Sequence, residues 1–128
     1  MGMFKGLFNR TTVDKLNGKT PDFLNGFEEI HYAEKTYKIT KNLLSNALHV
    51  KIGDSECLLF FADYGSSTKK SLAVFKDEAG KLQVIPYGFG SDERVTLKSP
   101  FVEAARKAFT AAEDKFPEWK QHPEGLKM

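Results

Sequence analysis

The sequence predicts an α+β fold, with an antiparallel β-meander of about five to seven strands packed against a C-terminal α-helix. Apolar and polar residues alternate with period two from about Glu28 onward, and an apolar stripe with helical spacing follows Ser99. The chain has 128 residues, 41% of them hydrophobic, which suits one globular domain. We therefore expect an N-terminal irregular or short helical segment over 1–26, the sheet over 27–98 and the helix over 99–120.

The segment 11–26 is rich in Gly, Asn and Thr and is predicted to be irregular. Pro21 favours the first position of a helix, so a short helical turn is expected after it. Before this segment, three apolar residues fall on one helical face: Phe4, Leu7 and Phe8. Such a face can rest on a membrane, although one helical turn buries too little apolar surface for stable anchoring.

Three segments then alternate apolar and polar residues, as strands with one buried face do. Their apolar positions are Ile30 and Tyr32, Tyr37 and Ile39, and Leu48, Val50 and Ile52. His31 and His49 occupy the opposite positions, so both are expected on the surface. Residues 42–47, just before the clearest of these strands, fit a helical turn as well as a strand.

The segment ECLLFFADY is apolar on both faces, which predicts a central strand covered above and below. KSLAVFK is the next strand, DEAG a hairpin loop and KLQVIPY the following strand. Pro86 lacks an amide donor, so the end of that strand is expected at a sheet edge. GFGSDE is predicted to be a loop and RVTL a last short strand.

The C-terminal helix is expected to begin with Ser99 as N-cap and Pro100 in the first turn, and to end before Pro117. Its apolar positions recur every three or four residues, at Val102, Ala105, Phe109, Ala112 and Phe116. That spacing predicts a stripe buried against one face of the sheet.

Charge and cysteine content exclude several classes of protein. The net charge is +2, from 19 basic and 17 acidic residues, which argues against binding to nucleic acid through phosphate neutralisation. The single cysteine, Cys57, lies in an apolar strand and is expected to pack in the core. The start of the chain lacks a secretory pattern and no run is apolar enough to span a membrane, so a cytoplasmic location is expected.

Three features of the sequence suggest chemistry, and each lacks a required part. DYGSSTKKS has no second glycine before its lysines, as a phosphate-binding loop needs, and no partner motif accompanies its S-x-x-K spacing. GFGSDE lacks the third glycine of a dinucleotide fingerprint. His31, His49 and His122 have no metal-ligand spacing. We therefore expect no catalytic, cofactor-binding or metal-binding residues.

The sequence thus favours a small non-catalytic protein-binding module, such as an inhibitor, immunity-type protein, adaptor or regulatory protein. Loops that interrupt the sheet at aromatic residues supply the candidate contacts, namely Tyr64, Lys69, Lys70, Tyr87 and Phe89, with Phe89 either tucked onto the core or offered to a ligand. The partner is another protein, or a second copy paired through an edge strand. Two alternatives stay open: a small-ligand-binding protein or small enzyme with a pocket between sheet and helix, and a membrane-surface or lipid-headgroup binder.

Overall fold

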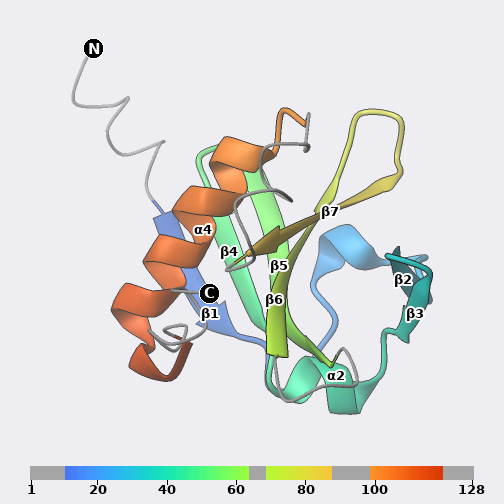
Figure 1. Ribbon diagram of the computed structural model, residues 1–128, viewed down its shortest axis with the longest axis horizontal. Coiled ribbons are helices and arrows are strands. Elements are labelled where there is room, and N and C mark those ends of the chain that lie inside the picture. Colours follow the sequence, from blue (N-terminus) through green and yellow to red (C-terminus); the bar gives the residue numbers. More distant parts are fainter. Residues whose placement is uncertain (1–10, 64–68, 88–98, 120–128) are drawn as a thin grey trace.

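The protein is described by a computed structural model over residues 11–63, 69–87 and 99–119, with side chains described for 11–61, 71–86 and 99–119. These residues form a five-stranded antiparallel sheet, a two-stranded sheet and a C-terminal helix, which confirms the predicted α+β class. Figure 1 shows three layers, in which helix α4 lies on one face of the larger sheet, and the small hairpin and helix α2 lie on the other side. RVTL, GFGSDE and the last residues of the chain lie outside the described residues.

The larger sheet has the strand order β1-β4-β5-β6-β7. Its strands are β1 (Thr11–Lys15), β4 (Leu48–Ile52), β5 (Ser55–Asp63), β6 (Lys69–Lys76) and β7 (Leu82–Tyr87). Strands β4 to β7 follow one another through the sheet as the predicted meander. Two of their connections are short turns, one at Gly53 and Asp54 and the other closed by a bond from the amide of Gly80 to the carbonyl of Asp77.

Strand β1 corrects the expectation that residues 11–26 are irregular. Thr11–Lys15 pairs antiparallel with β4, with Val13 opposite Val50. Val13 is the only buried residue of this strand, and its neighbours are exposed. A strand with one apolar residue carries almost no alternation, so its main-chain pairing with β4 defines it. The expected turn after Pro21 is present as a 3-10 turn, η1 (Asp22–Leu24).

The first two predicted strands form a separate hairpin and are not part of the main sheet. They are β2 (Glu29–Tyr32) and β3 (Lys35–Lys38). The two turn residues, Ala33 and Glu34, both have positive φ, at 52° and 64°. This is the backbone of a tight hairpin turn, which matches the twist of the strands although no glycine is present.

Helix α2 (Lys41–Ser45) resolves the ambiguous segment before β4 as a helical turn. It begins where the Thr40 hydroxyl accepts a hydrogen bond from the amide of Leu43 at 3.2 Å. Leu44 is its buried residue and packs beneath the sheet in the second core cluster. Helix α2 therefore packs on the same side of the sheet as η1 and the β2–β3 hairpin.

Helix α4 (Val102–Lys115) has Phe101 at its N-cap position, two residues after the predicted Ser99. Ser99 orders a turn ahead of the helix, because its hydroxyl accepts from the amide of Phe101 at 3.1 Å and its carbonyl from that of Val102 at 3.2 Å. The predicted stripe is buried at Ala105, Phe109 and Ala112, together with Ala108. A final 3-10 turn, η2 (Pro117–Trp119), follows the helix and buries Trp119.

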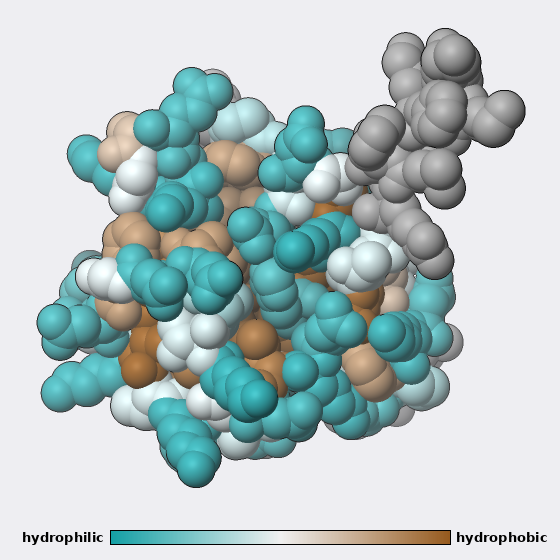
Figure 2. Space-filling model, turned by 180° about the vertical axis from the view of Figure 1, so that it is seen from behind, coloured by the Kyte–Doolittle hydropathy of each residue, from teal (hydrophilic) through white to brown (hydrophobic). Residues whose placement is uncertain are grey.

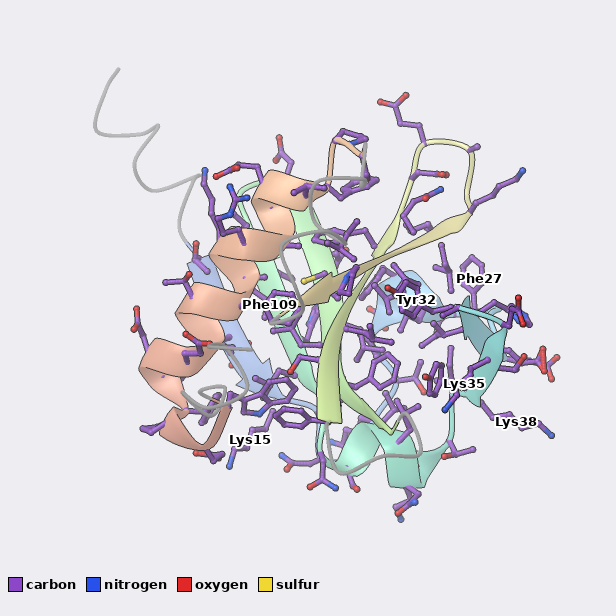
Figure 3. All side chains as sticks on the ribbon, viewed as in Figure 1. Lys15, Phe27, Tyr32, Lys35, Lys38 and Phe109 are labelled. Carbon is purple, nitrogen blue, oxygen red and sulfur yellow. The ribbon has the colours of Figure 1, made fainter. Side chains whose placement is uncertain are left out.

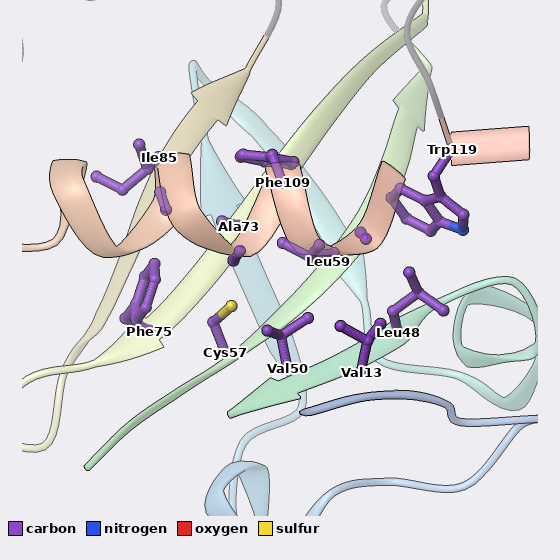
Figure 4. Close-up of a cluster of buried hydrophobic side chains, with 13 residues drawn as sticks. Val13, Leu48, Val50, Cys57, Leu59, Ala73, Phe75, Ile85, Phe109 and Trp119 are labelled. Carbon is purple, nitrogen blue, oxygen red and sulfur yellow. The ribbon is translucent and has the colours of Figure 1, made fainter. Parts of the chain in front are cut away.

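Two core clusters explain why β5 is apolar on both faces. The first lies between α4 and the sheet and includes Cys57, Leu59 and Phe109, as Figure 4 shows. The second lies between the sheet and the N-terminal layer, which consists of η1, the β2–β3 hairpin and α2. It includes Ile30, Leu58 and Phe60. Side chains of the first cluster therefore occupy the space between helix and sheet where a pocket was the alternative expectation, and the hollows described below lie at the ends of the sheet.

Candidate functional site: a groove at the end of the sheet

An open groove of about 860 Å³ lies where β4 begins and β5 ends, beside α2. We call it the end groove, and its lining includes Lys15, Tyr37, Lys38, Phe60, Phe61 and Trp119. Its walls come from β3, α2, β5 and η2, so the fold brings together residues far apart in sequence. Figure 2 shows apolar surface emerging between polar side chains in the lower half of the molecule, the half that holds α2 in Figure 1.

An aromatic pair forms one wall of the end groove. The rings of Phe61 and Trp119 are stacked, with centroids 4.1 Å apart and an interplanar angle of 25°. Trp119 is buried, whereas Phe61 is 37% exposed, the one large apolar side chain among the described residues that is classed as exposed. Aromatic side chains in this half-covered state are typical anchors of protein interfaces, because they bring a large apolar area at a low cost in side-chain entropy.

The other face of β5 supplies the second aromatic wall. Phe60 is buried and meets the ring of Tyr37, from β3, edge to face with centroids 5.4 Å apart. This contact fixes the hairpin against the sheet at the groove. The aromatic side chains of the groove are therefore held by packing on both sides of β5.

Charged side chains tie the rim of the groove together. The ammonium of Lys15, in β1, lies 3.4 Å from the carboxylate of Glu118 and 4.9 Å from the ring centroid of Phe116. Lys115 donates to the main-chain carbonyl of Val13 at 2.6 Å. These contacts join β1 to the end of α4 and to η2, which carries Trp119. The opposite rim carries Lys38, which is exposed and makes no ion pair with a described residue.

Several polar groups of the lining already have structural roles. The Thr40 hydroxyl caps α2, and the Ser45 hydroxyl donates to the carbonyl of Asn42 at 2.7 Å. The described lining holds no histidine, cysteine or aspartate, and Glu118 is its only carboxylate. General acid–base catalysis needs a group that titrates near the working pH within reach of its substrate. The described residues of the groove can thus bind a partner, but they offer no pair for proton transfer.

The two described histidines lie apart, in different sheets. His49 corrects its predicted surface position: Nε2 lies 2.7 Å from a carboxylate oxygen of Glu56, and the ring stacks on Phe23 with centroids 5.7 Å apart. It is half-buried because the N-terminal layer covers the sheet face that the alternation suggested was open. His31 is exposed as predicted, beside Glu29 at 3.4 Å and Thr36 at 3.2 Å. His49 lines neither the end groove nor the far hollow described below.

Two titrating groups elsewhere have shifted pKa values. Burial, with a smaller contribution from the charge of Glu56, raises the pKa of the Cys57 thiol and keeps it protonated in the core. The pKa of Asp77 is lowered by hydrogen bonds from the amide of Lys81 and the side chain of Gln83. Asp77 thereby stabilises the β6–β7 turn. No group of three or more potential metal ligands occurs among the described residues.

The structure brings part of the predicted contact set to the same end of the sheet. In the strand register Phe61 lies opposite Ser71, and Ser71 lies opposite Tyr87, so Tyr87 is in the same row as Phe61. Lys70 lies one row away, opposite Ala62, and Lys69 lies two rows away, opposite Asp63; the side chains of Lys69, Lys70 and Tyr87 are outside the described set. Tyr64 and Phe89 lie outside the described residues altogether.

The sequence analysis missed Phe61 and Trp119 as candidate contacts. Phe61 follows Phe60 within a uniformly apolar strand, and nothing in the sequence distinguishes the two. Trp119 follows Pro117, which ends the helix. The sequence therefore indicates that Trp119 does not belong to the helical stripe, but it does not show which surface the ring contacts. Both residues depend on where α4 stops relative to β5, which only the structure shows.

A second concave surface, the far hollow, lies at the opposite end of the sheet and has a volume of about 780 Å³. It lies around the β4–β5 and β6–β7 turns and the start of α4. Its charged lining residues are Asp54, Glu56, Lys76, Asp77 and Glu78, so acidic groups predominate. The two ends of the sheet therefore differ in charge.

No protein-family model, curated protein or solved structure matches this chain. Among the described residues, no helix is both long enough and apolar enough to cross a membrane.

Proposed function

We propose that the protein is a small non-catalytic protein-binding module, of the inhibitor, immunity-type, adaptor or regulatory kind, and that the end groove is its contact surface. The observation that carries the proposal is Phe61, which is 37% exposed at the edge of a concave site and held by its stack on Trp119. An exposed, rigidly held aromatic at a groove is the feature that binding hot spots share.

The predicted contacts extend this surface. Lys69, Lys70 and Tyr87 stay in the proposal because their main chains lie in the row of Phe61 or within two rows of it. A stable interface buries about 800 Å² on each side, so a partner would have to cover these rows as well as the groove. The proposal therefore joins the residues predicted from sequence to the aromatic pair that the structure adds.

The experiment is site-specific photo-crosslinking in cells that naturally make the protein. A photoreactive phenylalanine analogue replaces Phe61 in one sample and Thr110, an exposed residue of α4, in the matched control. The expected result is a cross-linked protein that is captured from position 61 and not from position 110. That protein is then purified, and its binding to the wild-type chain and to Phe61→Ala is measured by calorimetry.

Loss of an interface anchor costs about 2 kcal/mol or more, so Phe61→Ala should weaken binding by about 30-fold. Circular dichroism at the temperature of the binding assay checks that the variant is folded. Equal affinity of a folded Phe61→Ala would show that the groove is not the contact surface. A small molecule that native mass spectrometry detects on the wild type, and that Phe61→Ala loses, would favour the small-ligand alternative.

Pairing of two copies through an edge strand stays a proposal, and the structure favours one edge for the test. β1 and β7 end the described sheet. The Val13 carbonyl of β1 already accepts a hydrogen bond from Lys115, which a pairing strand would have to displace. We therefore propose β7 as the edge at which a second copy could add.

A further inference from the structure

The outer edge of the β2–β3 hairpin presents main-chain groups that face away from it. The amide of Ile39 donates to the carbonyl of Glu28 at 2.9 Å, so these two residues form a hydrogen-bonded pair at the open end of the hairpin. Bonded and non-bonded pairs alternate along an antiparallel ladder, which places Thr36 and Lys38 in non-bonded pairs. The main-chain amides and carbonyls of Thr36 and Lys38 therefore point away from β2.

Among the described residues, none supplies a main-chain hydrogen-bond partner on this side of Thr36 and Lys38, and both residues are exposed. The edges of the larger sheet are less complete. The Val13 carbonyl of β1 accepts from Lys115, and Pro86 leaves β7 one donor short. Strand β3 thus offers the amide and carbonyl of two alternate residues, which is the spacing that an adjoining strand requires.

This edge of β3 borders the end groove. Thr36, Tyr37 and Lys38 all line the groove, whereas its described lining contains no residue of β2. Side chains of a strand alternate between its two faces, so a cavity over one face touches every second residue. A cavity that touches three successive residues lies along the edge of the strand. Figure 3 shows Lys38 on the outer strand of the hairpin, pointing away from the body of the molecule, with Tyr32 nearer the larger sheet.

The two faces of this edge determine which side chains an added strand can carry. On the outer face the register places Glu29 opposite Lys38, so their charges balance and the pair does not select a charged partner. On the inner face the ring of Tyr37 meets that of Phe60, with centroids 5.4 Å apart. An added strand continues the alternation, so its residue opposite Tyr37 faces this aromatic side, and its residues opposite Thr36 and Lys38 face the outer side.

We infer that the end groove binds an extended segment of a partner protein, which adds to β3 as an antiparallel strand. The segment carries an apolar side chain opposite Tyr37 and polar side chains on either side of it. Antiparallel pairing lets Thr36 and Lys38 each exchange two main-chain hydrogen bonds with the segment. Both pairing residues of the segment must supply an amide donor, so neither is proline. This inference rests on the proposed function and specifies the form of its partner.

The experiment starts from a phage-displayed random peptide library that is selected on the wild-type protein. Peptides whose binding is weakened by Phe61→Ala are kept, because Phe61 lines the end groove. Hydrogen exchange detected by NMR then compares the main-chain amides of Thr36 and Lys38 in the free protein and in each peptide complex. Fluorescence anisotropy measures the affinity of the same peptides for wild type, Thr36→Val, Thr36→Pro and His31→Pro, after circular dichroism has shown that each variant is folded.

We expect peptide binding to slow exchange of the Thr36 and Lys38 amides by at least about tenfold. Thr36→Pro removes one outward donor and should weaken binding by about tenfold, whereas Thr36→Val keeps that donor and should change affinity by less than about twofold. His31→Pro is the matched control and should leave affinity unchanged, because His31 lies opposite Thr36 and its amide faces the other edge of the hairpin.

N-methylated peptides test the same hydrogen bonds without changing the protein. Methylation of either residue that pairs with Thr36 or Lys38 should weaken binding by about tenfold, and methylation of the residue between them by less than about twofold. Equal effects at all three residues would contradict strand pairing and overturn the inference.

The possible failures are distinguishable. Peptides that need Phe61 but leave exchange of the Thr36 and Lys38 amides unchanged would overturn the inference and leave the proposed function standing. Absence of any peptide whose binding depends on Phe61 would count against both. Sedimentation and hydrogen exchange of the protein alone, over a range of concentrations, test a second copy as occupant: self-association that slows exchange of the Thr36 amide would assign the β3 edge to another molecule of this chain and overturn the inference.

Discussion

Replacement of Phe109 by Ala tests whether α4 is the lid of the sheet. Phe109 is 2% exposed at the middle of the first core cluster, which Figure 4 shows between the helix and the strands. A buried Phe removes about 150–250 Å² of surface from water, which at about 25 cal/mol per Å² gives an upper bound of about 4–6 kcal/mol. Because Ala retains part of this burial, we expect the free energy of unfolding to fall by about 3–5 kcal/mol.

Urea unfolding followed by circular dichroism measures this loss, and a thermal melt should shift by roughly 10–20 °C for a domain of this length. The matched control is Thr110→Ala, one residue further along the same helix but exposed. Because Ala is the better helix former, this change should be neutral or slightly stabilising. A loss below about 1 kcal/mol for Phe109→Ala, with an unchanged m-value, would mean that α4 does not pack on the sheet in solution.

Three further outcomes are expected. The Cys57 thiol should be inert to a thiol reagent such as DTNB in the native protein and react on unfolding, whereas a cysteine introduced by Thr12→Cys should react at once; rapid native reaction of Cys57 would contradict its burial. Folding lowers the pKa of Asp77, so its ionised form stabilises the protein at pH values above the unfolded pKa. Urea unfolding should therefore show that Asp77→Asn is less stable than wild type at pH 7, with the difference in unfolding free energy shrinking as the pH falls through the folded pKa. A difference that does not depend on pH would contradict this. Gly18→Ala should lower the melting temperature more than Gly26→Ala, since both have positive φ but only at Gly18 would the added Cβ meet a side chain, at 3.0 Å; equal losses would leave only backbone strain.

Much of the fold could be predicted because its strands and helix bury whole faces. The alternation Leu48, Val50, Ile52 marks β4, and the apolar character of both faces of β5 places it at the centre of the sheet. The stripe through Phe109 marks the helix that covers one face. Each of these patterns follows from burial of many residues at once, so it survives any uncertainty about a single contact.

Other parts could not be predicted because few residues carry them. Strand β1 buries only Val13, so its pairing with β4 leaves no periodic signal. His49 was assigned to the surface because alternation identifies two faces of a strand but does not say whether the second face is covered. In this protein the N-terminal layer covers it, and Phe23 and Glu56 enclose the ring.

The candidate site depends on how differently two adjacent phenylalanine side chains are shielded from solvent. Phe60 and Phe61 are adjacent, yet one is 2% exposed and the other 37%. The hairpin reaches over Phe60 through Tyr37, whereas α4 ends at Lys115 and, among the described elements, η2 supplies the ring that stacks on Phe61. Where a helix stops relative to the strand beneath it depends on the tertiary packing of both elements, so local sequence could not identify Phe61.

The histidine–carboxylate pair of the sheet lies outside the end groove. His49 and Glu56 form the closest histidine–carboxylate contact among the described residues, at 2.7 Å, and they are the natural candidates for proton transfer. The His49 ring stacks on Phe23 of the N-terminal layer, and His49 is absent from the lining of the groove. The end groove, by contrast, presents the partly exposed ring of Phe61, which stacks on the buried Trp119. A surface that offers an aromatic ring at a concave site suits recognition of a partner, and its described lining contains no histidine–carboxylate pair.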